Sequence, residues 1–273
     1  MKQNPPAPIS VSNAMPKQRL HRAFFRNGAN HRAGADVSFA DIVKIFGFRG
    51  IEVGRWVTPQ EQQIAANLFF DALCDMMDIL QVPESVLSLK GTLALAFGTG
   101  GRRYVCAHYS SQKRQLALAK NAGGGALAHE WFHAFDHYIC EKAFVGRKPH
   151  QFASEVWLNE LLSPESHPLN TLLFEFFQSV FLSEPKGEPS ALVKASITVD
   201  KSQSSYYYAR PQELCARAFE AVVQANVIKN AFLVQGTQQS KEAELGLYPK
   251  SDLCLKISEP LYAYFYQLGK ALG

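Results

Sequence analysis

Two histidines four residues apart enclose a glutamate in the H-E-x-x-H motif His129-Glu130-Trp131-Phe132-His133. The motif lies in residues 127–138, a run without glycine or proline that is typical of a helix. Each helical residue turns about 100°, so side chains four residues apart lie on the same face. Both imidazoles can therefore hold one metal ion, with Glu130 beside them to take a proton from water. The spacing predicts a Zn²⁺ cofactor and the catalytic arrangement of zinc peptidases.

A hydrolytic zinc site needs a third protein ligand and an open position for water. The best candidate is Glu213, because Pro211 suits the first turn of a helix and places this glutamate early in it. Arg217 and Glu220 lie on the same helical face. We expect Glu213 to be the metal ligand, with Glu220 in reserve and Arg217 in an outer shell, holding a carboxylate in place. The alternative is an ordinary surface helix with a Glu–Arg pair.

Three tyrosines, Tyr206-Tyr207-Tyr208, come just before this glutamate. A phenol that faces the metal could donate a hydrogen bond to the oxyanion formed when water attacks a carbonyl. The alternative is that the tyrosines only pack. Tyr206 stands seven residues before Glu213, which resembles the interval in lethal-factor-type toxin proteases. We therefore take Tyr206 as the first choice for this catalytic role and Tyr208 as the second.

Three further polar residues stand near the motif. Asp136 shares a helical face with both motif histidines, and we expect it to orient a ligand imidazole from the second shell. An alternative frame, His133 to His137, resembles the inverted H-x-x-E-H motif with the shorter Asp in place of Glu. His137 is otherwise expected to be exposed or in the outer shell. His108, on a predicted strand, is a candidate for lining the substrate cleft, or else is an ordinary hydrogen-bonded strand histidine.

The elements that must position these residues are partly readable from the chain. Thr58-Pro59-Gln60-Glu61 predicts a capped helix start, and Pro83 ends that helix. Residues 92–97, 104–109 and 115–119 predict a small antiparallel sheet with a hairpin. Gly123-Gly124-Gly125 predicts a tight turn into the motif helix. Helices are predicted afterwards at 151–162, 168–182, 190–203, 211–226 and 256–271. The expected fold is α+β and helix-dominated, a zincin-like domain whose antiparallel sheet packs on the motif helix.

The chain divides by charge into an N-terminal arm, residues 1–35, and a single domain, residues 36–273. No acidic residue occurs before Asp36, whereas six Lys or Arg residues do. We expect a flexible or loosely docked basic arm. Its alternatives are a solvated tail and a weak contact with nucleic acid or an acidic partner, which would be sensitive to salt.

The bulk composition argues against several classes of protein. Apolar residues make up 47% and charged residues 19% of the 273 residues, as in ordinary globular proteins. A net charge of +4 is too mild to indicate nucleic-acid binding by itself. The five cysteines are widely spaced and form no C-x-x-C pair, which predicts reduced core thiols and a cytoplasmic protein. No signal-peptide core or membrane-length apolar stretch is present, so no membrane partner is expected.

Several blocks together resemble the first type of large polyvalent-protein-associated domain, which occurs in multidomain proteins of phages and conjugative elements. The blocks are residues 46–52, 54–56, 88–98, 127–136 and 210–220. The resemblance covers roughly residues 46–225 and implies a zincin-like metal site at His129, His133 and Glu213, with Glu130 as the base. One departure is Phe132, where such sequences usually have Gly. Small bacterial proteins labelled CLCA-like are a second resemblance, although the long metzincin motif is absent at Asp136 and Ile139.

These observations predict a zinc-dependent peptidase of the Glu-ligand type that hydrolyses amide bonds of a protein or peptide. The alternative is a catalytically silent interaction module that keeps the zincin scaffold and is associated with mobile elements.

Overall fold

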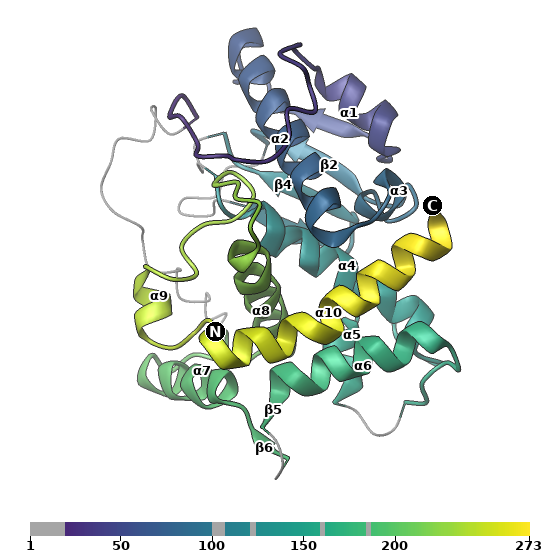
Figure 1. Cartoon of the computed structure of the whole chain (residues 1–273), viewed down its shortest axis with the longest axis vertical. Coiled ribbons are helices and arrows are strands. Elements are labelled where there is room, and N and C mark those ends of the chain that lie inside the picture. Colours follow the sequence, from purple (N-terminus) through teal and green to yellow (C-terminus); the bar gives the residue numbers. More distant parts are fainter. Residues whose placement is uncertain (1–19, 100–106, 121–123, 159–161, 184–186) are drawn as a thin grey trace, which may run out of the picture.

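The computed structural model describes residues 20–99, 107–120, 124–158, 162–183 and 187–273 (Figure 1). Helices dominate the described chain, as the α+β prediction requires. The helices are α1 (Phe39–Phe46), α2 (Pro59–Leu80), α3 (Glu84–Leu87), α4 (Leu127–Ala143), α5 (Ala153–Trp157), α6 (Pro168–Phe181), α7 (Ala191–Ser202), α8 (Pro211–Ala225), α9 (Lys241–Glu244) and α10 (Ser251–Leu272). The strands are β1 (Ile51–Val53), β2 (Ala94–Phe97), β3 (Ala107–Ser110), β4 (Gln115–Leu118), β5 (Leu182–Ser183) and β6 (Glu188–Pro189).

The main sheet is mixed, so the prediction of an antiparallel sheet was wrong. Its strand order is β1-β2-β4-β3, and only the β3–β4 hairpin is antiparallel. β4 lies between β2 and β3 and runs in the same direction as β2. All four residues of β2 are buried, and an uninterrupted apolar strand is typical of a parallel, central position. β5 and β6 form a separate small hairpin.

Strand register determines which residues meet the helices. Leu95, Phe97, Leu116 and Tyr109 share one face, because side chains alternate along each strand and these positions align across the sheet. The ring of Phe97 packs against Phe39 of α1 and Phe69 of α2. The hydroxyl of Tyr109 hydrogen-bonds a histidine of α4. Helices α1, α2 and α4 therefore pack on the same face of the sheet.

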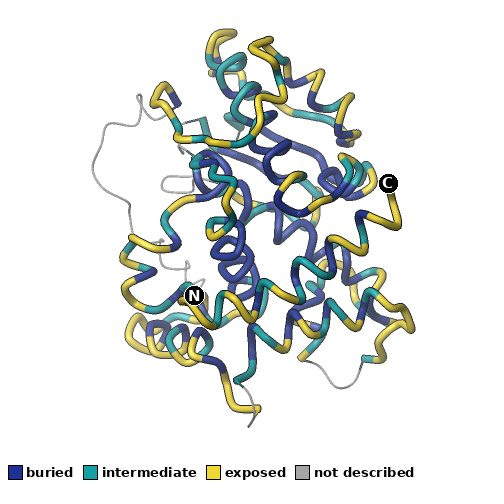
Figure 2. Tube along the Cα trace, in the orientation of Figure 1, coloured by how far each residue is buried: buried dark blue, intermediate teal, exposed yellow. Residues whose placement is uncertain are grey.

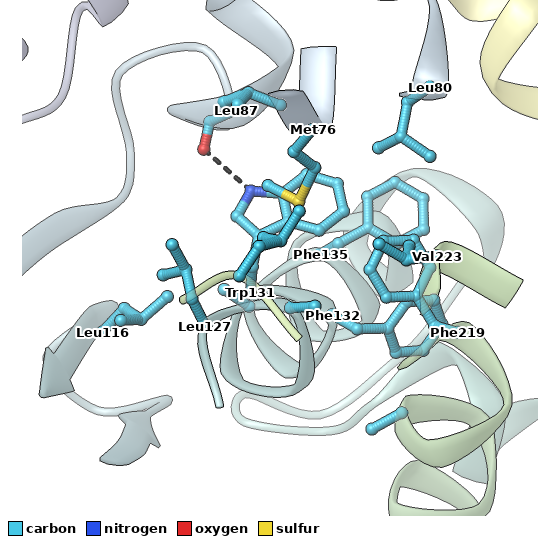
Figure 3. Packing of buried hydrophobic residues seen from close by; sticks show 14 of the residues in the cluster. Met76, Leu80, Leu87, Leu116, Leu127, Trp131, Phe132, Phe135, Phe219 and Val223 are labelled. Carbon is cyan, nitrogen blue, oxygen red and sulfur yellow. Dashed lines mark hydrogen bonds between the residues drawn. The ribbon is translucent and has the colours of Figure 1, made fainter. Parts of the chain in front are cut away.

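The core runs from this sheet face into the centre of the helices, where α4 and α8 are the most deeply buried (Figure 2). Trp131 and Phe132 of α4 pack against Phe219 of α8 (Figure 3). Trp131 and Phe135 also pack against Phe265 of α10. The indole Nε1 of Trp131 donates to the Leu87 carbonyl over 2.9 Å, which anchors α4 to α3 without leaving a buried donor unpaired.

The predicted helix boundaries are largely confirmed. Thr58 and Glu61 form the expected capping box, and α2 ends at Leu80, followed by Gln81 in a left-handed conformation. The helices predicted at 168–182, 190–203 and 211–226 are α6, α7 and α8 within two residues at each end. α10 begins five residues earlier than predicted and continues through Pro260, whereas the segment predicted at 151–162 forms only α5; residues 159–161 lie outside the described residues.

Residues 20–35 of the N-terminal arm lie against the domain; residues 1–19 lie outside the described residues. The guanidinium of Arg26 forms two 2.7 Å hydrogen bonds to the fully buried carboxylate of Asp75 in α2. Asn230 donates to the same carboxylate over 2.7 Å. The sequence predicts an arm that is either flexible or loosely docked. The contacts of residues 20–35 agree with a docked segment.

A glycine permits this close contact. A Cβ at Gly28 would lie 1.9 Å from Asp75 Oδ1, so a larger residue would push the arm away from α2. Arg32 forms a second ion pair, with Asp71, at 3.0 Å. Both pairs join the arm to one face of α2.

Cys74, Cys140, Cys215 and Cys254 are free thiols in the structure, and Cys106 lies outside the described residues. Within the parts of the chain that the structure describes, no helix has the length and apolar character needed to cross a membrane.

Substituting Arg26→Met should lower the free energy of unfolding by about 3 kcal/mol, because the Asp75 carboxylate would stay buried without its charged partner. Urea denaturation measures this change. The control is Arg32→Met, whose partner is partly exposed and whose loss should cost less than about 1 kcal/mol. Equal losses for the two variants would contradict the role given to the Arg26–Asp75 pair.

Candidate metal centre

The two motif histidines face one another on α4. Their Nε2 atoms are 3.0 Å apart, and the ring planes are nearly perpendicular. The intervening Trp131 and Phe132 are fully buried in the core (Figure 3). Phe132 therefore fills core space with Phe176 and Phe219, and its ring takes no part in the histidine cluster.

Glu213 is brought to the same point by α8. Its Oε2 lies 3.3 Å from His129 Nε2, and its Oε1 lies 3.5 Å from His133 Nε2. Pro211 occupies the start of α8, which leaves Glu213 in the first turn, as the sequence predicts. His129, His133 and Glu213 thus lie together, each with one ligand atom within 4.8 Å of the others.

The cluster fits a tetrahedral metal. Donor atoms about 2.0–2.1 Å from zinc stand roughly 3.3 Å apart in a tetrahedron. The shortest separations between the three side chains are 3.0 Å between the two Nε2 atoms, and 3.3 and 3.5 Å from these atoms to different oxygens of the Glu213 carboxylate. Glu213 Oε2 is buried and has no hydrogen-bond partner among the described residues. A metal ion would satisfy this oxygen, and the residues therefore fit Zn²⁺.

Charges of both signs meet in the cluster. Burial opposes ionisation of His129, but Glu220 and Glu213 raise the pKa of its imidazole well above the usual value. Burial also opposes ionisation of Glu213, yet His133 and His129 hold its pKa well below the usual value. The carboxylate is thus available as an anionic ligand.

The outer nitrogen of His129 is held by a carboxylate that sequence analysis kept only as a reserve ligand. Glu220 Oε2 lies 2.9 Å from His129 Nδ1, and the Tyr248 hydroxyl donates to the same oxygen over 3.3 Å. Because the Glu220 carboxylate favours a proton on Nδ1, a metal ion would bind His129 through Nε2. The sequence predicts Glu220 as a reserve ligand, and the structure places its carboxylate on the outer nitrogen of His129. The sequence does not single out Tyr248, because it lies on a loop with no recognisable spacing to the motif.

Asp136 does not hydrogen-bond a ligand imidazole, in contrast to its predicted role. Its carboxylate accepts from the Ser154 backbone N–H over 2.8 Å and from the Ser154 hydroxyl over 2.5 Å. Burial raises the pKa of Asp136 to about 6. Asp136 therefore ties α4 to α5, one turn beyond His133.

The phenol beside the site is that of Tyr207. Burial raises its pKa, and the carboxylates of Glu213 and Glu130 raise it further, so it lies within reach of both charges. Tyr207 is 40% exposed, whereas Tyr206 is 63% exposed and its ring packs under the guanidinium of Arg210. Tyr208, the second choice, is buried, with its ring centroid 5.4 Å from the guanidinium of Arg217.

The tyrosine loop is held by one buried carboxylate. Asp200 accepts from the backbone N–H groups of Tyr207, Tyr208 and Ala209, at 2.8–3.1 Å, and from the Ser205 hydroxyl at 3.0 Å. Burial opposes its ionisation, but these hydrogen bonds lower the pKa of Asp200. The loop therefore presents Tyr207 in a defined position.

Arg217 also supports this loop. The sequence predicts that it holds a carboxylate in place, but its hydrogen bonds among the described residues go to carbonyl and hydroxyl oxygens. It is buried and donates to the carbonyls of Tyr208 and Leu247, at 2.6 and 2.7 Å, and to the Ser196 hydroxyl at 3.0 Å. It therefore joins α8 to α7 and to the loops that carry Tyr207 and Tyr248.

The remaining histidines lie apart from the cluster. His108 is exposed and lies on the sheet face opposite to Tyr109, so it faces away from α4. His137 is buried, not exposed, and its Nδ1 is 2.8 Å from the Tyr109 hydroxyl. Burial lowers the pKa of His137 to about 4. The structure therefore does not bring His133 and His137 together as the inverted motif would require.

Comparison with known proteins gives one family match. No curated protein sequence and no solved structure matches the chain. The match covers α8, α10 and the segment between them, and it overlaps the predicted resemblance only between residues 199 and 225. Residues 199–272, which carry Glu213, Glu220 and Tyr248, match the family of large polyvalent protein-associated domain 1, and the resemblance is confirmed for that part of the chain.

Proposed function

We propose that His129, His133 and Glu213 hold Zn²⁺ and that the protein is a zinc-dependent peptidase of the Glu-ligand type. The observation that carries this proposal is the convergence of the two Nε2 atoms and the Glu213 carboxylate, at separations of 3.0–3.5 Å, with Glu220 on the outer nitrogen of His129. Bound zinc supplies a Lewis acid that lowers the pKa of water and polarises a carbonyl. A zincin-like arrangement is part of the same proposal.

Two side chains of the protein, Glu130 and Tyr207, then have separate roles in the reaction. Glu130 takes a proton from the attacking water and passes it to the leaving amine, a role that fits its place on α4 beside both histidines. Tyr207 keeps its phenol proton because its pKa is raised. It can therefore donate a hydrogen bond to the oxygen that becomes negatively charged. Tyr207 replaces Tyr206 in this role.

A second candidate is a catalytically silent interaction module associated with mobile-element proteins. It is favoured by the family match, since that family is described by its association with polyvalent proteins. Metal analysis of the purified protein separates the two candidates, because a chain without zinc supports the module.

Substituting Glu130→Gln should leave zinc bound and abolish peptide cleavage, because the amide cannot accept the proton. Proteome-wide cleavage profiling compares this variant with the wild type, and metal analysis verifies its zinc. Glu84→Gln, on the exposed start of α3, is the matched control and should cleave as the wild type does. Cleavage by the Glu130→Gln protein would refute the assignment of the base.

Substituting Glu213→Ala should reduce the zinc content of the purified protein, because only two ligands remain. Glu244→Ala, on exposed α9, serves as the control and should keep the wild-type zinc content. Unchanged zinc in the Glu213→Ala protein would move the third ligand elsewhere.

Substituting Glu220→Gln should raise the zinc Kd by about 10–100-fold, because the carboxylate on His129 Nδ1 is lost. Tyr248→Phe should have a smaller effect in the same direction, since it removes only the hydrogen bond to Glu220. Competition with a chelating dye measures both. Tyr262→Phe, whose hydroxyl contacts Asn226, should behave as the wild type, and wild-type affinity in Glu220→Gln would contradict the outer-shell role.

A further inference from the structure

A groove of about 660 Å³ runs between the C-terminal half of α8 and the first half of α10. Ala221 and Val222 of α8 line one side of it, and Tyr248, Pro249 and Leu255 line the other. Most of this lining is aliphatic or aromatic. The groove therefore differs in character from the charged metal cluster.

Two large aliphatic side chains at the groove are strongly exposed. Val227 is 83% exposed and Leu255 is 66% exposed. Single exposed aliphatics need no explanation, but two of them bordering one apolar groove are typical of an interaction surface. A ligand in the groove would cover both.

The N-terminal arm runs beside this groove. The side chain of Asn27 donates to the carbonyl of the groove residue Val227 over 3.0 Å. Backbone bonds from Asn27 to Lys229 and from Ala231 to Phe25 make the two segments antiparallel. Leu20, the first described residue, is buried in the main core and therefore anchors the arm.

The length of residues 1–19 is sufficient to reach the groove. An extended chain spans up to about 3.3 Å per residue, so nineteen residues reach roughly 60 Å. A folded chain of this size has a radius of gyration of about 18 Å. Any point on the surface of the domain is therefore accessible from Leu20.

The chemistry of residues 1–19 also fits the groove. They contain Pro5-Pro6-Ala7-Pro8, followed by Ile9 and Val11, and no acidic residue. Proline-rich segments with a P-x-x-P spacing adopt the polyproline II helix and dock in grooves lined by aromatic rings, with little loss of conformational entropy. Tyr248 and Tyr262 provide such rings here.

We propose that residues 1–19 of the same chain occupy the groove between α8 and α10, with the Pro5–Pro8 segment against Tyr248 and Tyr262. The arm is then an intramolecular ligand. Because Tyr248 also donates to Glu220, the docked arm contacts the outer end of the hydrogen-bond chain that supports His129. The docking itself does not depend on zinc or on peptidase activity, so it can fail while the proposed function holds, and the reverse.

The test is site-specific photo-crosslinking in the full chain. The photoreactive residue p-benzoylphenylalanine replaces Leu255 at the groove, and in a control chain it replaces Tyr266. Tyr266 is also exposed on α10, about 16 Å further along the helix and outside the groove. After irradiation, mass spectrometry identifies the linked peptides in a mixture of ¹⁵N-labelled and unlabelled protein.

The expected result is a set of crosslinks from position 255 to residues 1–19 of the same molecule, in large excess over those from position 266. Combining Pro5→Asp and Pro8→Asp should lower the yield at position 255 to the level of the control. Crosslinks from position 255 that exclude residues 1–19, or equal yields at the two positions, would overturn the proposal. Crosslinks between labelled and unlabelled copies would assign the groove to a second chain and would also overturn it.

Discussion

The contact between α4 and α8 is the constraint on which the rest of the structure depends. His129 and His133 lie on one face of α4, and their third partner, Glu213, comes from a helix far along the chain. The two helices can approach because the contact is built from Phe132, whose ring centroid lies 5.0 Å from that of Phe219, and from small residues of α8 such as Ala216. A shift of α8 by one turn along its axis would move Glu213 by about 5 Å, and its carboxylate would no longer contact the two histidines.

The outer contacts serve to hold that arrangement. Glu220 is on the same helix as Glu213 and binds the outer nitrogen of His129, so α8 supplies both a proposed ligand and the group that orients another. Arg217, between them in sequence, joins α8 to the loops that carry Tyr207 and Tyr248. One helix therefore organises the cluster, its outer shell and the neighbouring phenols.

Local features were readable from the sequence. The capping box at Thr58 and the spacing of the motif histidines depend on residues a few positions apart, and the structure agrees with both. Glu213 could be selected because a tetrahedral site demands a third ligand and Pro211 indicates where its helix begins. The fold class followed in the same way from the lengths and periodicity of the segments.

What the sequence could not predict depends on contacts between distant segments. The hydrogen bonds of Asp200 determine which of three adjacent tyrosines faces the cluster, and no local pattern encodes them. Asp136 has suitable helical spacing, but its carboxylate accepts a hydrogen bond from Ser154, which lies on another helix. The position of β4 between β2 and β3 likewise depends on burial of the whole strand.

The central claim is that two imidazoles and one carboxylate hold zinc, and X-ray absorption at the zinc edge of the purified full chain tests it most directly. The expected result is a four-coordinate ion with nitrogen and oxygen donors at about 2.0 Å and the outer-shell scattering of two imidazoles. Zinc–sulfur scattering near 2.3 Å, an all-oxygen shell, or no zinc at all would contradict it.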